Sequence, residues 1–171
     1  MDKANVFRAF AFMRAVFDGV AAEFPGVDSA HHYVDATALD MLRRPWSFDV
    51  LPTENMFGDI LSDLGAGLVG GMGFSPSADI GGRHAVFQPA HGTAPDIAGQ
   101  GVANPTAAIL SAAMMLDWLA SRGAGRNFAD AAVELESAVD AAFAAGLRTP
   151  DIGGADNTAA VVRAVRGRIG A

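Results

Sequence analysis

The chain has 171 residues, of which 51% are hydrophobic and 18% charged, a composition typical of a globular protein that can bury a core. Its net charge of −7, with only 12 basic residues, excludes nucleic acid and anionic lipid as partners, because phosphate neutralisation requires clustered lysine and arginine. The lack of cysteine excludes thiolate metal sites, and no apolar run approaches the roughly 18 residues of a membrane span. We therefore expect a cytoplasmic protein that does not bind membranes.

Apolar periodicity predicts the elements of the first 70 residues. Side chains at steps of three and four, from Val6 to Phe24, predict a long first helix that Pro25 and Gly26 end. In chain order, the predicted elements are a helix over 4–24, a strand over 32–34, a helix over 37–44, a strand over 48–51 and a helix over 57–69.

The remaining chain alternates loops with helices. A glycine-rich stretch at 70–73 leads to a strand at 85–88 and a polar loop up to Asn104, which we expect to cap a helix whose first residue is Pro105. That helix runs to about 121, a second begins at the cap Asn127 and ends at Gly146, and a last one covers 158–168. Helices alternating with short strands predict an α/β architecture.

Two aspartates four residues apart give the first chemical signal. Asp59 and Asp63 lie on one face of the predicted helix, since side chains at i and i+4 are neighbours. Like charges at this spacing destabilise a helix slightly unless a cation lies between them, and Mg²⁺ and Mn²⁺ prefer such oxygen ligands. A solvated acidic face explains the same spacing. The residues alone leave both interpretations open.

The loop over residues 89–99 gives the second signal. Its small residues let backbone approach a ligand, Thr93 and exposed amides suit phosphate, and Asp96 suits ribose hydroxyls. The loop matches neither a P-loop nor the G-x-G-x-x-G pattern, so an ordinary polar surface loop explains it equally well.

Six segments in register resemble one enzyme family. They are residues 2–6, 33–35, 53–63, 91–99, 103–105 and 149–154. Together they resemble the second half of the metal-dependent β-decarboxylating dehydrogenases, the isocitrate and 3-isopropylmalate dehydrogenase family, over nearly the whole chain. The resemblance implies a partial isopropylmalate-dehydrogenase-like α/β fold that lacks the N-terminal half of the sheet.

The resemblance implies the oxidative decarboxylation of a small 2-hydroxy acid. Hydride leaves a secondary alcohol for NAD⁺, and the β-keto acid then loses CO₂ through an enolate held by Mg²⁺ or Mn²⁺. Asp59 and Asp63 would bind this metal from one subunit of a homodimer with shared active sites, and Asp35 would reach in from the partner. Lys3, also from the partner, would act with Asp35 in catalysis as general base or proton relay. Asn5 would lie near the nicotinamide.

The cofactor that the resemblance implies is NAD. Asp96 and Ile97 stand where NADP-using relatives carry a basic and an aromatic residue, and a carboxylate there accepts ribose hydroxyls and repels a 2′-phosphate. His91 would flank the adenine ring and Asn104 would read the adenine. The other residues expected around the nucleotide are Gly92, Thr93, Ala94 and Pro95. Gln88 departs from the family, which often has glutamate there.

Important parts of the family pattern are missing from this chain. The arginines that grip the substrate and a catalytic tyrosine lie upstream of the segment that matches Lys3, and the single tyrosine, Tyr33, matches a strand residue instead. We therefore expect a C-terminal half, in which residues 1–69 belong to the smaller, dimer-forming domain and 70–171 to the larger nucleotide-binding domain. Strand edges and apolar faces left without their partners would favour association.

Three functions follow from these expectations. The chain is the metal- and NAD-binding half of an oxidative decarboxylase, inactive without the missing half. Alternatively, it is a non-catalytic regulatory subunit that pairs with a complete relative, or a truncated remnant. The substrate stays open among 3-isopropylmalate, D-malate or tartrate, and isocitrate or homoisocitrate, with a slight preference for 3-isopropylmalate or a malate-type acid because of Asp96 and Ile97.

Overall fold

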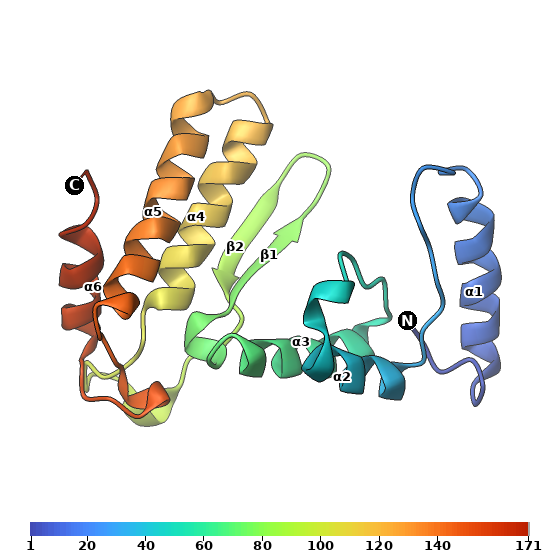
Figure 1. Cartoon of the computed structure of the whole chain (residues 1–171), viewed down its shortest axis with the longest axis horizontal. Coiled ribbons are helices and arrows are strands. Elements are labelled where there is room, and N and C mark those ends of the chain that lie inside the picture. The colour runs from blue at the N-terminus through green and yellow to red at the C-terminus, as the bar shows by residue number, and fades with distance from the viewer. Residues whose placement is uncertain (171) are drawn as a thin grey trace. The chain divides into compact units, whose positions relative to one another are not determined.

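The computed structural model describes residues 1–170. Its α-helices are α1 (Arg8–Ala21), α2 (Val34–Arg43), α3 (Asn55–Leu68), α4 (Thr106–Ser121), α5 (Arg126–Ala144) and α6 (Thr158–Arg166) (Figure 1). Its strands are β1 (Pro76–Ile80) and β2 (Ala85–Pro89), and its 3₁₀ helices are η1 (Pro45–Ser47), η2 (Met72–Phe74), η3 (Pro95–Ile97) and η4 (Pro150–Ile152). The α/β class predicted from the sequence is confirmed, and the sheet of the described residues has two strands.

The chain divides into two compact units, the first over Met1–Leu68 and the second from Val69 onward. In the first unit, Asp2 and Tyr33 form a parallel backbone bridge. The Asp2 N–H donates to the His32 carbonyl at 3.0 Å, and the Val34 N–H donates to the Asp2 carbonyl at 2.8 Å. The N-terminal segment is thereby attached to the start of α2.

Helices of the first unit are only partly covered. α1 buries no residue, although its Phe10 stacks on Phe57 of α3 with ring centroids 5.3 Å apart. α3 buries Phe57 and Leu61, which lie on one face four residues apart, buries Ala66 near its C-terminal end, and also contacts α2. Asp59, Ile60 and Asp63 of the same helix are exposed.

α4 is the central element of the second unit. The β1–β2 hairpin is antiparallel, with Pro76 opposite Pro89, and it packs along α4. α5 lies beside α4 on another side (Figure 1). Ala107 and Ala113 of α4 are completely buried, and such small side chains let neighbouring elements approach closely.

A cluster of buried hydrophobic residues in this unit lies between α5 and α6. Val161 and Val165 of α6 pack against Val139 and two alanines of α5. Asn157 begins α6 by accepting a hydrogen bond from the Ala160 N–H at 2.8 Å. The short last helix is therefore held by a cap at its start and by its apolar face.

The helices expected from periodicity and the strand expected over 85–88 are confirmed, with shifted ends. α1 begins later than residue 4 because the N–H groups of Val6 and Phe7 donate to the Lys3 carbonyl and form a turn there. Asn127 as the cap of α5 is wrong, since that helix begins at Arg126 after Gly125, whose φ is +121°.

Two strand predictions are wrong. Of residues 32–34, only the single Asp2–Tyr33 bridge forms, and Val34 already begins α2. Residues 48–51 adopt no strand. A strand is defined by its hydrogen-bonded neighbour, and the described part of the chain places none beside residues 48–51.

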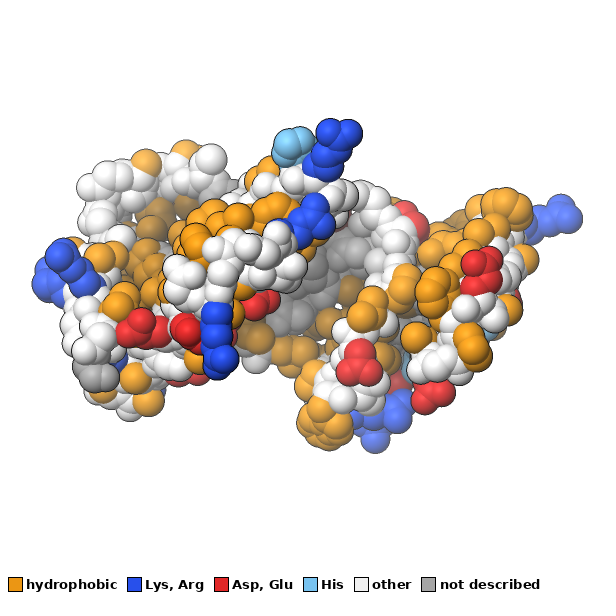
Figure 2. All heavy atoms as spheres, turned by 90° about the horizontal axis from the view of Figure 1, so that it is seen from above, with side chains coloured by type: hydrophobic (Ala, Val, Ile, Leu, Met, Phe, Trp, Pro, Cys, Tyr) orange, Lys and Arg blue, Asp and Glu red, His pale blue; other side chains and the backbone are white. Residues whose placement is uncertain are grey.

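Large hydrophobic side chains are exposed in both units (Figure 2). Trp46 and Val50 of the first unit are each 80% exposed, and Val133 of the second is 63% exposed. Apolar surface of this kind favours association with another surface. Separately, none of the described helices combines the length and apolar composition needed to cross a membrane.

Adjacent valines of α6 give a matched test of its packing. Val161 is 0% exposed and Val162 is 46% exposed. Because Val161→Ala leaves a cavity, we expect it to lower the free energy of unfolding by about 2 kcal/mol, whereas Val162→Ala should change it by less than about 0.5 kcal/mol. The helix propensity change is the same in both variants. Urea unfolding followed by circular dichroism measures the difference, and equal costs would contradict the packing described here.

Candidate functional site

Lys3 and Asp35, predicted to act together, are in direct contact. The Lys3 ammonium Nζ donates to Asp35 Oδ1 at 2.6 Å. Lys3 follows the backbone bridge at Asp2, and Asp35 lies in the first turn of α2. The Lys3 side chain is 22% exposed and that of Asp35 is 67% exposed, so the carboxylate stays accessible to a ligand while the lysine is largely covered.

Asp35 is held in its ionised form. The hydrogen bond from Lys3 is the main cause that lowers the pKa of this carboxyl below its ordinary value, and backbone N–H groups at the start of α2 act in the same direction. Such N–H groups have no partner within the helix and favour a negative charge. The carboxylate is therefore ready to bind a cation at neutral pH.

The neighbouring Asp2 is buried and fully engaged. Only 2% of this residue is exposed. Its Oδ2 accepts from Arg14 Nε at 2.7 Å, and its Oδ1 accepts from Arg14 Nη2 at 3.0 Å and from the Ala4 N–H at 2.7 Å. Such two-pronged pairing by arginine is strong and directional. Burial acts to raise the pKa of Asp2, but these hydrogen bonds outweigh burial and lower it.

Tyr33 carries two cations over its ring. Arg14 Cζ lies 4.8 Å and Lys3 Nζ 5.9 Å from the ring centroid, both within the range of a cation–π contact. Tyr33 also forms the bridge with Asp2 and directly precedes α2. The segment around Lys3, the helix α1 and the start of α2 thus meet at this ring.

Asp59 and Asp63 lie on α3 and are both exposed. Glu54 begins this helix, because its carboxylate accepts from the N–H groups of Met56 at 3.1 Å and Phe57 at 2.9 Å. In residues 1–170, no three acidic or histidine side chains come close enough to hold a metal ion. One copy therefore does not bring Asp35 to Asp59 and Asp63. That Asp35 completes the site of a second copy stays a prediction.

The predicted nucleotide loop is exposed from Gly92 to Asp96, with Ile97 at 37%. His91 Nδ1 donates to the Gly92 carbonyl at 2.8 Å. This contact orients the ring, and Nε2 is the nitrogen that can accept a hydrogen bond from a ligand. Ala94 has a φ of +43° and is the only described residue other than glycine with a positive φ. Such backbone costs energy and is frequent at ligand sites.

Asn104 lies at a polar junction in the second unit. Its Nδ2 donates to Asp151 Oδ2 at 3.0 Å, and its Oδ1 accepts from the Thr106 N–H at the start of α4 at 3.0 Å. A Cβ at Gly73 would overlap the Asp151 carboxylate and press against the Asn104 side chain, so a larger residue there would displace this pair. Asn104 is 8% exposed, and its side chain is engaged inside the protein. The adenine contact predicted for Asn104 therefore depends on its main chain or on the second N–H of its side-chain amide.

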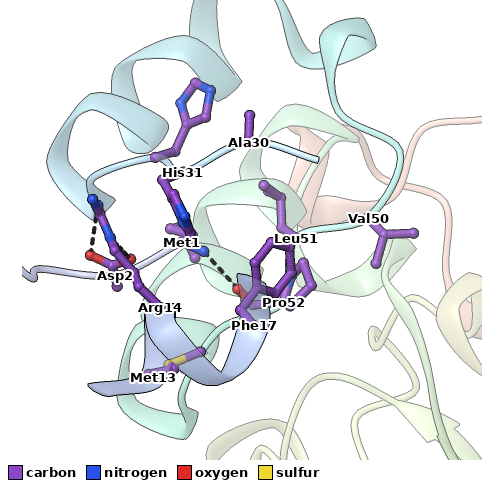
Figure 3. A pocket seen from close by; sticks show the side chains of 11 residues that line it. Met1, Asp2, Met13, Arg14, Phe17, Ala30, His31, Val50, Leu51 and Pro52 are labelled. Carbon is purple, nitrogen blue, oxygen red and sulfur yellow. Dashed lines mark hydrogen bonds and ion pairs between the residues drawn. The ribbon is translucent and has the colours of Figure 1, made fainter. Parts of the chain in front are cut away.

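Two cavities of the described residues are lined by none of the predicted site residues. One of about 50 Å³ lies beside the Asp2–Arg14 pair and is lined by Phe17, His31 and Leu51 among others (Figure 3). In this cavity the amino group of Met1 donates to the Pro52 carbonyl at 2.8 Å. A second cavity, of about 450 Å³, lies among β1, β2, α4 and α5. The first is smaller than known ligand pockets, which hold roughly 300–1,000 Å³.

Sequence reasoning missed three residues that shape these sites. Arg14 lies on a helix face that periodicity marks only as amphipathic, and its partner Asp2 precedes the lysine that attracted attention. Asp151 is separated from Asn104 by 47 positions. The motif around residues 149–154 pointed to the segment of Asp151, but nothing in the sequence identified its contact. Asn5, predicted near the nicotinamide, is exposed in the turn after Lys3.

Comparisons with known proteins agree over almost the whole chain. The sequence model of the family described as isocitrate/isopropylmalate dehydrogenase matches residues 1–165. The isocitrate/homoisocitrate dehydrogenase of Thermus thermophilus is 54% identical over 146 residues, which are 85% of this chain and 42% of that protein. The 3-isopropylmalate/3-methylmalate dehydrogenase of Methanocaldococcus jannaschii is 44% identical over 168 residues, 98% of this chain and 48% of that protein.

A solved structure agrees as well. The isocitrate dehydrogenase of Methylococcus capsulatus has a TM-score of 0.86 and 40% identity, covering 98% of this chain and 48% of that chain. The chain thus spans less than half the length of the relatives it matches. The expectation of a partial fold of this kind is confirmed.

The buried Asp2 carboxylate predicts a pH dependence. Because its folded pKa lies below the unfolded value of about 3.9, its contribution to stability is complete above that pH and is lost as the pH falls through the folded pKa. Asp2→Asn should therefore lower the free energy of unfolding at neutral pH, and its difference from wild type should shrink toward acid. Urea unfolding across this pH range measures it, with the exposed Asp28→Asn as control. A constant difference would contradict the assignment.

Two asparagines at helix starts provide a second test. Asn157→Asp keeps the capping oxygen at α6 and adds a charge that a helix N-terminus favours, so stability should hold or rise slightly. Asn104→Asp keeps the oxygen at α4 but places a second carboxylate against Asp151 and removes the donor, so we expect a loss of about 2 kcal/mol. Thermal unfolding of both variants, compared with wild type, measures the two changes in stability. Equal effects would show that the Asn104–Asp151 contact does not contribute.

Proposed function

The chain belongs to the isocitrate/isopropylmalate dehydrogenase family, and we propose that it forms the C-terminal half of an NAD-dependent oxidative decarboxylase of small 2-hydroxy acids. In this proposal it provides metal ligands, a lysine for proton transfer and a nucleotide-binding loop. The observation that carries the proposal is the Lys3–Asp35 pair, in which a covered ammonium contacts an exposed, ionised carboxylate at 2.6 Å. This pair belongs to the segments through which the sequence resembles the family.

The donor set fits a divalent metal. Asp35, Asp59 and Asp63 are exposed carboxylates, and hard oxygen ligands suit Mg²⁺ or Mn²⁺. Such a metal, when bound, polarises the substrate hydroxyl and stabilises negative charge on that oxygen. Asp59 and Asp63 would come from one copy and Asp35 from another, so that each copy contributes to two sites of a homodimer. Both aspartates of α3 are exposed, so a second copy can approach them.

In this proposal, Lys3 moves a proton during the reaction. Its ammonium has three N–H bonds. One donates to Asp35, and the other two can donate to a substrate hydroxyl or to water. When neutral, the same nitrogen accepts the hydroxyl proton as hydride departs, and it returns a proton to the enolate after CO₂ loss. The Lys3 side chain is only 22% exposed, which limits the amount of water around it.

The loop from His91 to Ile97 would hold NAD. Its exposed residues, the strained Ala94 and the fixed ring of His91 support a ligand role. Asp96 would accept the adenosine ribose hydroxyls and would repel the 2′-phosphate of NADP. We propose 3-isopropylmalate or a malate-type acid as substrate, with isocitrate and homoisocitrate as the alternatives.

Metal binding by the whole chain tests the half-site. Asp59→Asn with Asp63→Asn should weaken Mn²⁺ binding by roughly tenfold or more, because both carboxylates are lost. Glu136→Gln with Asp140→Asn removes another exposed acidic pair at the same spacing on α5 and should leave binding unchanged. Calorimetry with and without NAD⁺ provides the measurement. Equal binding in both double variants would show that charge alone attracts the metal.

Complementation tests the activity. The chain is co-purified with the upstream half of a family member, and NADH formation from 3-isopropylmalate, D-malate and isocitrate is followed with Mn²⁺. Activity that disappears with Lys3→Met supports the proposal. A stable, folded complex that binds Mn²⁺ and NAD⁺ but oxidises none of the three acids would contradict it.

A further inference from the structure

A partly buried ion pair, between Asp2 and Arg14, lies next to the Lys3–Asp35 contact. Asp2 is 2% exposed and is attached at both its backbone and its side chain: through the bridge to Tyr33, through Ala4, and through two hydrogen bonds from Arg14. Lys3 is the next residue along the chain. Its backbone position is therefore set by the contacts of Asp2, while its side chain extends to Asp35.

Arg14 connects three elements at this point. It extends from α1, binds the Asp2 carboxylate and lies 4.8 Å from the centre of the Tyr33 ring. Lys3 Nζ lies 5.9 Å from the same centre. An arginine that both pairs with a carboxylate and covers an aromatic ring fixes that ring more firmly than a lysine can, because its planar group does both at once.

We propose that Asp2 and Arg14 are positioning residues, which hold the backbone of Lys3 and the ring of Tyr33 so that the Lys3 ammonium meets Asp35 at the reacting centre. The role of Lys3 in catalysis rests on the proposed function, whereas the arrangement itself does not. Neither Asp2 nor Arg14 needs to touch substrate, because both act through Lys3.

The composition of the chain makes this arrangement directly observable. Lys3 is the only lysine and Tyr33 the only tyrosine. In the full chain with ¹³C-labelled lysine, the side-chain signals of Lys3 are the only lysine signals in the spectrum. In wild type we expect them to be shifted by the Tyr33 ring and to show magnetisation transfer to the ring protons.

Asp2→Asn and Arg14→Gln should both remove this transfer and move the Lys3 signals to their values in an unfolded chain. Asp18→Asn is the matched control, because Asp18 lies on the same helix as Arg14 and contacts His31 at 2.7 Å, away from Lys3, so removing its charge should leave Lys3 unchanged. Arg14→Lys keeps the charge opposite Asp2 and should keep the fold, but it loses the planar group and should shift Lys3 partway. Unchanged Lys3 signals in Arg14→Lys and Asp2→Asn would overturn the proposal.

The complemented enzyme adds a readout that altered folding does not imitate. In Arg14→Lys we expect kcat to fall by about tenfold or more with KM nearly unchanged, because a misplaced catalytic group slows the chemical step. A rise in KM with kcat unchanged would contradict a positioning role. If wild type is inactive, the proposed function fails, while the Lys3 spectra still decide whether Asp2 and Arg14 hold it in place.

Discussion

The burial of the Asp2 charge is the constraint on which the first unit depends. A carboxylate removed from water is costly unless it is paired, and breaking such a pair costs more than the pair contributes. Arg14 must therefore come to Asp2, which fixes where α1 lies relative to the N-terminal segment. The same segment forms the bridge to Tyr33 that precedes α2. The site pair is thus a consequence of satisfying one buried charge.

The second unit is organised differently. Its cohesion comes from small and branched apolar side chains between α4, α5 and α6, and its polar junction at Asn104 orders the loops around this core. Asn104 is engaged on both sides of its amide, toward Asp151 and toward the start of α4. The loop from Gly92 to Asp96, which we propose to bind the nucleotide, is exposed, with strained backbone at Ala94. A rigid scaffold with an exposed, strained loop is the usual way proteins present ligand-binding backbone.

Sequence patterns predicted the helices well because most of them, unlike the nearly all-apolar α4, show an apolar face within a few turns. Val161 and Val165 of α6, for example, recur at i and i+4. The strands over 32–34 and 48–51 were wrong because strand formation depends on a distant neighbour, which local pattern does not reveal. The Asp2–Arg14 and Asn104–Asp151 contacts were not predicted for the same reason, because their partners are distant in the sequence. The family resemblance identified Lys3 and Asp35, but only the structure shows what holds them together.

The Asp35 carboxylate can contact both the Lys3 ammonium and a metal ion. Lys3 Nζ binds Asp35 Oδ1, and a carboxylate offers about four lone-pair positions on its two oxygens, so capacity for a cation remains. If Asp35 bound a divalent cation as proposed, that second positive charge would lie close to the Lys3 ammonium and repel it. Its arrival would therefore weaken the hold of Asp35 on Lys3 at the moment when the lysine is needed for proton transfer. Under both proposals, Asp2 and Arg14 would then keep the lysine in place when its direct partner no longer does.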